Sequence, residues 1–202
     1  MKKRLLALSV ATAIGMGTAH AFEVATNGIG MYNLLPYYSA QAGNATLIQV
    51  TNTDTINGKA VKVRFRGAEW SDDVLDFTLF MSPGDVWTGG VSANGLIAGL
   101  FTADNSCTLP EDVNQDFVTS RLEASDSAAA GTREGYFEII TMADIPYEYS
   151  EGENGIEFAP PSEQSDLANA IKHVNGEPIC NGEVDSGAPN VLNNLQPDHP
   201  SE

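Results

Sequence analysis

Positive charge is scarce in this sequence of 202 residues. It holds 10 Lys and Arg against 27 Asp and Glu, which gives a formal net charge of −17 at pH 7. Such a chain repels the phosphates of nucleic acids and the headgroups of anionic lipids. We therefore expect neither nucleic acid nor an anionic membrane surface as a partner. The composition favours a solvated acidic surface and is compatible with cation binding.

Motifs that carry catalysis are also missing. The sequence has no Gly-x-Ser-x-Gly, no His-Glu-x-x-His and no glycine-rich phosphate-binding loop. His173 and His199 have no evident nucleophile or carboxylate partner. Paired carboxylates for glycoside hydrolysis are uninformative in so acidic a chain. We predict a protein that is not an enzyme and needs no cofactor.

Long apolar runs are lacking except near the start of the chain. Residues 1–4 carry three basic side chains, Leu5 to Met16 is apolar, and Ala19-His20-Ala21 is a small-x-small cleavage site. These features predict a signal peptide over residues 1–21 and a mature chain that begins at Phe22. The apolar run is too short to span a bilayer comfortably. We expect export to the periplasm, cell surface or exterior, with no membrane insertion after cleavage.

Only two cysteines are present, Cys107 and Cys180. In an exported protein such a pair favours a disulfide bond. A metal site would need further His or Cys ligands, and a redox pair usually has a C-x-x-C spacing, which is absent.

Removal of residues 1–21 leaves 202 − 21 = 181 residues and a net charge of 7 − 27 = −20. This length suits one domain with a substantial core.

The stretch from Ala45 to Val91 alternates between apolar and polar side chains. Val61, Val63 and Phe65 alternate with basic residues, and residues 75, 77, 79 and 81 form a second apolar face with Val74, Asp76, Thr78 and Phe80 opposite. Asn57-Gly58 and Ser82-Pro83-Gly84-Asp85 are turn signals. We predict one antiparallel sheet of three strands and the start of a fourth, covered by a second layer. The fold class is mainly β: an antiparallel β-sandwich, Ig-like or jelly-roll-like, with one or two short helices.

The flanking segments complete this domain, which we place at residues 22–183. Residues 34–38 predict an edge strand, or a strand lent to a neighbouring subunit. Residues 135–143 predict a buried strand of the second sheet. Short helices are expected at 113–122 and after Ser165, a loop at 124–133, and a disordered tail at 184–202.

Basic side chains gather on one predicted strand, as Lys62, Arg64 and Arg66. Ion pairs with Asp72, Asp73 and Asp76 on the adjoining loop and strand would explain why these basic side chains gather there. The alternative is a contact strip that docks an acidic patch on another copy of the protein.

A partial calcium-loop pattern begins at Asp112. Asp112, Asn114, Asp116 and Glu123 fill ligand places one, three, five and twelve, but Phe117 replaces the glycine that the sharp turn needs. The pattern therefore predicts a calcium loop that lacks its turn glycine.

Several segments carry a resemblance to known proteins: residues 48–53, 61–66, 71–77, 81–87, 106–110, 133–140 and 170–174. Over them the chain resembles the N-terminal part of a group of uncharacterised bacterial secreted proteins called cell surface proteins. The resemblance implies a surface location and no catalytic residue. We expect a non-enzymatic exported cell-surface or extracellular structural protein that associates with itself or with other surface proteins. The alternative is a glycan- or calcium-binding surface module.

Overall fold

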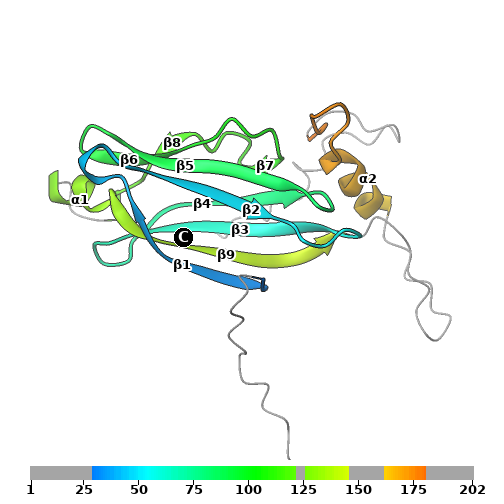
Figure 1. Ribbon diagram of the computed structural model, residues 1–202, viewed down its shortest axis with the longest axis horizontal. Helices are drawn as coiled ribbons and strands as arrows, with labels where there is room; N and C mark the ends of the chain where they lie inside the picture. The colour runs from blue at the N-terminus through cyan, green and yellow to red at the C-terminus, as the bar shows by residue number, and fades with distance from the viewer. Residues whose placement is uncertain (1–28, 122–125, 146–161, 181–202) are drawn as a thin grey trace, which may run out of the picture.

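The computed structural model describes residues 29–121, 126–145 and 162–180, and it shows two antiparallel sheets packed face to face (Figure 1). The predicted signal peptide, the tail at 184–202 and Glu123 lie outside these residues. Sheet A has the strand order β1-β9-β3-β4-β7, and sheet B has the order β2-β5-β6-β8. The elements are β1 (Tyr32–Ser39), η1 (Gln41–Gly43), β2 (Ala45–Thr51), β3 (Gly58–Gly67), β4 (Asp73–Met81), β5 (Val86–Asn94), β6 (Ile97–Phe101), β7 (Thr108–Leu109), β8 (Gln115–Asp116), α1 (Asp126–Gly131), β9 (Glu134–Ile145) and α2 (Ser162–Ile171). The predicted β-sandwich with short helices is confirmed.

The main core lies between the two sheets. Alternate side chains of β3 and β4 point into it, as the sequence pattern predicts, and they meet Trp87 and Val91 from β5. Burial of these large apolar side chains stabilises the fold by about 1.5–3 kcal/mol each. Four buried aromatic rings pack together at one end of this core: Tyr38, Phe65, Phe117 and Phe137.

A second apolar cluster lies on the outer side of β4, where α2 is attached by the predicted disulfide. Cys107 and Cys180 are bonded, with their Cα atoms 5.4 Å apart. Leu167 and Ile171 of α2 pack there with Phe80. The prediction that Phe80 faces solvent is wrong because this helix covers it. Val74 was also expected outside and is buried in the main core.

The predicted single sheet over 45–91 is wrong in its pairing. β2 pairs with β5 in sheet B, whereas β3 pairs with β4 and β9 in sheet A. The loop after β2 crosses between the sheets instead of forming a hairpin. Its buried Asn52 donates hydrogen bonds from Nδ2 to the carbonyls of Asn57 and Ser82, both at 2.9 Å. These bonds hold the crossing loop against the β4–β5 turn.

The predicted type II turn is present, but it too joins different sheets. Gly84 has φ +72, and the Asp85 N–H donates to the Ser82 carbonyl at 3.2 Å. β4 before it belongs to sheet A and β5 after it belongs to sheet B.

Three other segments differ from the sequence-based expectation. β9 is a strand, as predicted, but it lies in the same sheet as β3. The helix predicted at 113–122 is not formed over 113–121, because the backbone there bonds to other strands: Gln115–Asp116 form β8, and the Phe117 N–H donates to the Ala98 carbonyl at 2.8 Å. The predicted loop at 124–133 contains α1, whose run of alanines favours a helix. The helix expected after Ser165 is present as α2, but it begins earlier, at Ser162, and ends at Ile171.

Candidate functional site

One side of the sandwich is formed by two strand edges, those of β1 and β2. Within the described residues each of these strands has a partner on one side only, β9 for β1 and β5 for β2. The two edges are joined at one end by Thr46. Its hydroxyl accepts a hydrogen bond from the Ser39 N–H at 2.9 Å and donates one to the Ser39 carbonyl at 3.0 Å. At the other end, near Thr51, the edges are not joined in this way.

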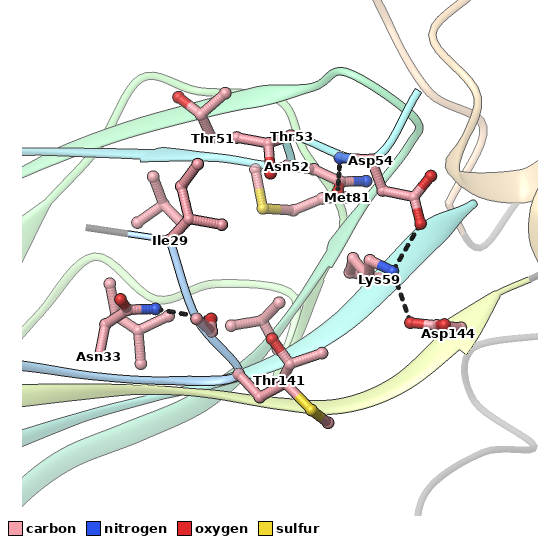
Figure 2. Close-up of a pocket in the computed structure, with 15 residues that line it drawn as sticks. Ile29, Asn33, Thr51, Asn52, Thr53, Asp54, Lys59, Met81, Thr141 and Asp144 are labelled. Carbon is pink, nitrogen blue, oxygen red and sulfur yellow. Dashed lines mark hydrogen bonds and ion pairs between the residues drawn. The ribbon is translucent and has the colours of Figure 1, made fainter. Parts of the chain in front are cut away.

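A cavity of about 450 Å³ opens between the sheets at the Thr51 end, and we call it the seam (Figure 2). Its apolar wall consists of core side chains that are otherwise buried, and the exposed Ile29 also lines it (Figure 2). Next to it, the pairing of β3 with β9 shifts register between Ala60 and Val61. Such bulges are common beside functional sites. The seam is lined by Ile29, Gly30, Met31, Asn33, Val50, Thr51, Asn52, Thr53, Asp54, Lys59, Val61, Met81, Ile139, Thr141 and Asp144.

The charged groups of the seam form one cluster at its rim (Figure 2). Lys59 Nζ donates to Asp54 Oδ2 at 2.8 Å and to Asp144 Oδ1 at 2.6 Å. Burial lowers the pKa of Lys59, but the hydrogen bonds to Asp144 and Asp54 outweigh it and raise that pKa above its ordinary value. Lys59, with the backbone N–H groups of Asn57 and Ile56, holds the pKa of the Asp54 carboxyl well below its usual range. Lys59 and Asp54 therefore both stay ionised at neutral pH.

The two edge strands carry no charge at all. Between Glu23 and Asp54 the sequence has no Asp, Glu, Lys, Arg or His, although the chain as a whole has 37 charged residues, 10 + 27. Large apolar side chains are exposed along the same stretch: Ile29, Met31, Tyr32, Leu34, Tyr37 and Leu47. We call β1 and β2 the uncharged side, which adjoins the seam with its charged rim. Proteins usually protect exposed strand edges with charges, so an edge without them is suited to pairing.

The opposite edges of the two sheets look different. β7 and β8 have two residues each, and Pro110, Glu111 and Asp112 follow β7 directly. Short strands, proline and charge are the usual means of protecting an edge from further pairing. The contrast indicates that the uncharged side is specialised.

The predicted contact strip lies on the outer face of sheet A, with acidic partners from the same chain. Lys62 Nζ lies 2.7 Å from Asp76, Arg64 Nε lies 3.4 Å from Asp73, and Arg66 Nε lies 3.5 Å from Glu138. Burial and the Asp76 carboxylate raise the pKa of Asp73, while Arg66 and Arg64 lower it in part. Glu138, on the neighbouring strand β9, was not among the expected partners. Docking of this strip to another copy stays a prediction.

The predicted calcium ligands have separate local roles in the structure. Asp112 Oδ1 accepts from the Asn114 N–H at 2.9 Å, and Asn114 Oδ1 accepts from the Thr102 N–H at 2.6 Å. Asp116 lies in β8 beside Asn94. Across residues 29–121, 126–145 and 162–180, no three His, Cys, Asp or Glu side chains converge as a metal ion would require. Because Glu123 lies outside these ranges, calcium binding here stays untested.

His173 has a carboxylate neighbour that sequence spacing does not reveal. Its Nδ1 lies 3.8 Å from Asp85 Oδ2, and Ser106 Oγ approaches the same oxygen at 3.5 Å. The Ser106 hydroxyl is also 2.7 Å from Asp104 Oδ1. The serine and the histidine therefore share a carboxylate. In a nucleophilic triad the histidine would instead lie between serine and carboxylate.

A third surface feature lies on the outer face of sheet B. Leu47, Gly90 and Phe101 are cross-strand partners on β2, β5 and β6. A Cβ atom at Gly90 would collide with the Phe101 ring, so the ring lies over the glycine. Phe101 is nevertheless partly exposed, and Leu47 is 79% exposed. Polar side chains surround this pair: Gln49, Thr88, Ser92, Asn94, Thr102 and Asn114.

No family model, curated protein or solved structure matches this chain. Neither helix in the described part of the chain is long and apolar enough to cross a membrane.

Sequence reasoning missed the seam because it assigned β2 and β3 to one sheet. The absence of charge from Val24 to Thr53 was the available signal. This absence of charge can be interpreted only once the fold shows that β1 and β2 lie on the same side of the sandwich.

Proposed function

We propose that this protein is a non-enzymatic, exported structural component of the cell surface or extracellular space, and that copies of it associate through the uncharged side. The observation that carries the proposal is the pair of uncharged, partly apolar strand edges beside the seam. A free strand edge offers a row of backbone N–H and C=O groups to another chain. A strongly acidic chain can approach a second copy closely only where its own charge is low.

Features elsewhere in the chain support the same proposal. The signal peptide predicted over residues 1–21 and the resemblance inferred from the sequence favour a location outside the cytoplasm. The Cys107–Cys180 disulfide is of the kind that persists in oxidising compartments. The ion pairs across β3, β4 and β9 neutralise the basic strip within the chain, so the uncharged side is the stronger candidate for contact.

Sedimentation velocity of residues 22–202 at increasing protein concentration tests this proposal. We expect oligomers that persist or grow as salt is added, because salt screens repulsion between acidic copies and does not weaken apolar contact. Leu47→Asp and Tyr37→Asp should shift the population to monomer by placing charge on the uncharged side. Leu96→Asp is a matched control, since Leu96 is exposed in the β5–β6 turn. A chain that stays monomeric at every concentration and salt level would overturn the proposal.

The outer face of sheet B favours a second candidate function, binding of a neutral glycan. An exposed ring that lies over Gly90 can stack on a sugar, and the surrounding amides and hydroxyls can bond its hydroxyl groups. Affinity electrophoresis in gels that contain neutral polysaccharides tests this candidate. Phe101→Ala should abolish any retardation of the chain, and Leu96→Ala should leave it unchanged. If none of a panel of neutral polysaccharides retards the unmodified chain, this candidate is wrong.

A further inference from the structure

We propose that two copies of this chain pair through the free edge of β2, antiparallel about a two-fold axis beside Ile48, so that sheet B of one copy continues into sheet B of the other. The inference rests on the proposed function, because it names the edge of the uncharged side through which the copies associate. It follows from the direction in which each edge strand points its backbone N–H and C=O groups.

The backbone of β2 points alternately toward β5 and away from it, and within the described residues β2 pairs with β5 alone. Just beyond the strand, the Asn52 N–H donates to the Asp85 carbonyl at 2.9 Å, in the same register as the β2–β5 pairs. In an antiparallel pair such bonded positions alternate with positions whose backbone groups face outward. Residues 46, 48 and 50 therefore bond to β5. The outward-facing positions are Ala45, Leu47, Gln49 and Thr51, and none of them is a proline or a charged residue.

The free edge of β1, by contrast, is closed at two places. The Thr141 N–H donates to the Met31 carbonyl at 2.7 Å, so positions 32, 34 and 36 face away from β9. Position 36 is a proline, which has no N–H to donate to another strand. Farther along, the N–H and the carbonyl of Ser39 are both bonded to the Thr46 hydroxyl. Of the two edges, only β2 can therefore pair along its whole length.

The outward-facing positions of β2 are symmetric about Ile48, which favours a second copy as the partner. Antiparallel pairing about Ile48 sets Leu47 opposite Gln49 of the other copy, and Ala45 opposite Thr51. Every outward N–H of one strand then faces an outward C=O of the other, over all seven residues of β2. An axis at Leu47 or at Gln49 leaves one outward-facing position of each strand without a partner in β2.

Exposed side chains on the outer face of sheet B fit the same pairing. Leu47 is largely exposed, because its neighbour on β5 is Gly90, and Phe101 lies beyond that glycine on β6. In the paired sheet the two Leu47 side chains are diagonal neighbours across the axis, a separation that long side chains bridge. Pairing thus covers a leucine that the single chain leaves in water, and it joins the two Leu47–Phe101 pairs into one apolar strip.

The charge and the remaining edges of the chain limit the contact to two copies. With a net charge of −17 the chain repels its own copies, except where its surface is uncharged, as along β2. Pairing occupies the β2 edge of both copies, while Pro36 and the Ser39 bonds close the β1 edges. At the opposite edges, β7 and β8 have only two residues each. The association is therefore a closed dimer and not a fibre.

Proline substitution tests which edge makes the contact. Gln49→Pro removes an N–H that faces the free edge of β2, so the single chain should keep its fold while the dimer loses bonds beside its axis. Leu34→Pro is the matched control, because it removes an outward-facing N–H of β1 on the same side. Neither variant adds charge, so the comparison isolates backbone pairing.

The two proline variants are compared by sedimentation equilibrium of residues 22–202. We expect Gln49→Pro to weaken the dimer by about tenfold or more and Leu34→Pro to leave it unchanged, with a cooperative thermal transition in both. The inference is overturned if Gln49→Pro leaves the dimer unchanged, or if Leu34→Pro weakens it as much.

Disulfide trapping measures the register and does not depend on the proline variants. Leu47→Cys and Gln49→Cys are made in separate chains of residues 22–202, which are mixed and oxidised under mild conditions. Directly opposite Cα atoms of a bonded antiparallel pair lie about 5.5 Å apart, a separation that a disulfide spans. We expect a bridge between positions 47 and 49 of different copies, identified by mass spectrometry. Leu47→Cys mixed with Thr51→Cys is the control and should form about tenfold less bridge, because these positions are not opposite. Equal yields from the two mixtures would refute the register.

These measurements separate the inference from the proposed function. If the chain associates but Gln49→Pro does not weaken the dimer and positions 47 and 49 do not bridge, another part of the uncharged side makes the contact. The inference then fails while the proposed function stands. If residues 22–202 are monomeric at every concentration and salt level, both fail.

Discussion

The Thr46 hydroxyl bonds both backbone groups of Ser39, accepting from its N–H and donating to its carbonyl. Ser39 ends β1 in sheet A, and Thr46 lies near the start of β2 in sheet B. These two bonds therefore hold the edges of the two sheets together at the end of β1 and β2 that lies away from the seam. Here a side chain connects two sheets, whereas backbone hydrogen bonds connect neighbouring strands within each sheet.

Replacement of Thr46 by valine removes these bonds and keeps the shape of the side chain. We expect a loss of about 1–2 kcal/mol in the free energy of unfolding, because both backbone groups of Ser39 lose their partner. Faster hydrogen exchange at the Ser39 amide should accompany the loss. Thr78→Val is the control, as Thr78 lies mid-strand on the outer face of sheet A. Equal urea midpoints for Thr46→Val and the unmodified chain would contradict this role.

The Cys107–Cys180 disulfide closes a loop with a sequence separation of 73. The chain-entropy model gives about 4 kcal/mol for a loop of this length. We expect the double variant Cys107→Ser, Cys180→Ser to lose stability of this order and to be cleaved by protease in α2 before the sheets. Protease digestion followed by mass spectrometry checks the order. Cleavage that begins in the strands would show that the disulfide does not hold α2 in place.

Two glycines that face each other across β3 and β9 should differ sharply in how well they tolerate replacement by alanine. A Cβ atom at Gly135 would collide with the Arg66 carbonyl, which is backbone and cannot move aside, and would also meet the Tyr38 ring. At its partner Gly67, the nearest atom would be a Val74 methyl at 3.3 Å. We expect Gly135→Ala to cost about 3 kcal/mol or more and Gly67→Ala about 1 kcal/mol or less. Chemical denaturation compares them, and similar costs would refute the packing argument.

The Lys59 cluster predicts how stability depends on pH. The folded state lowers the pKa of Asp54, so its carboxylate stabilises the fold above the unfolded value of about 4, and this contribution is lost as pH falls below it. Asp54→Asn should lower the melting temperature at pH 7, and the difference from the unmodified chain should shrink below pH of about 4. Asp112→Asn, exposed and far from Lys59 in sequence, is the control. A difference that stays constant from pH 7 to pH 3 would exclude the linkage.

Alternation along individual strands could be predicted because it depends on local geometry. Val61, Val63 and Phe65 point inward and Lys62, Arg64 and Arg66 outward, as a period of two requires. The errors arose where a distant element changed the environment. Phe80 is buried by α2, and residues 115–116 are extended because β6 supplies their backbone partners. No local pattern records such contacts.

The sequence alone predicts the strands around residues 45–91 and most of their buried faces, the pairing of the only two cysteines and the excess of negative charge. These follow from side-chain periodicity and composition, which act over a few residues or over the whole chain. Which strands share a sheet depends on distant contacts, because the crossing loop held by Asn52 sends β2 and β3 to different layers. That partition places two uncharged edges side by side and opens the seam between them.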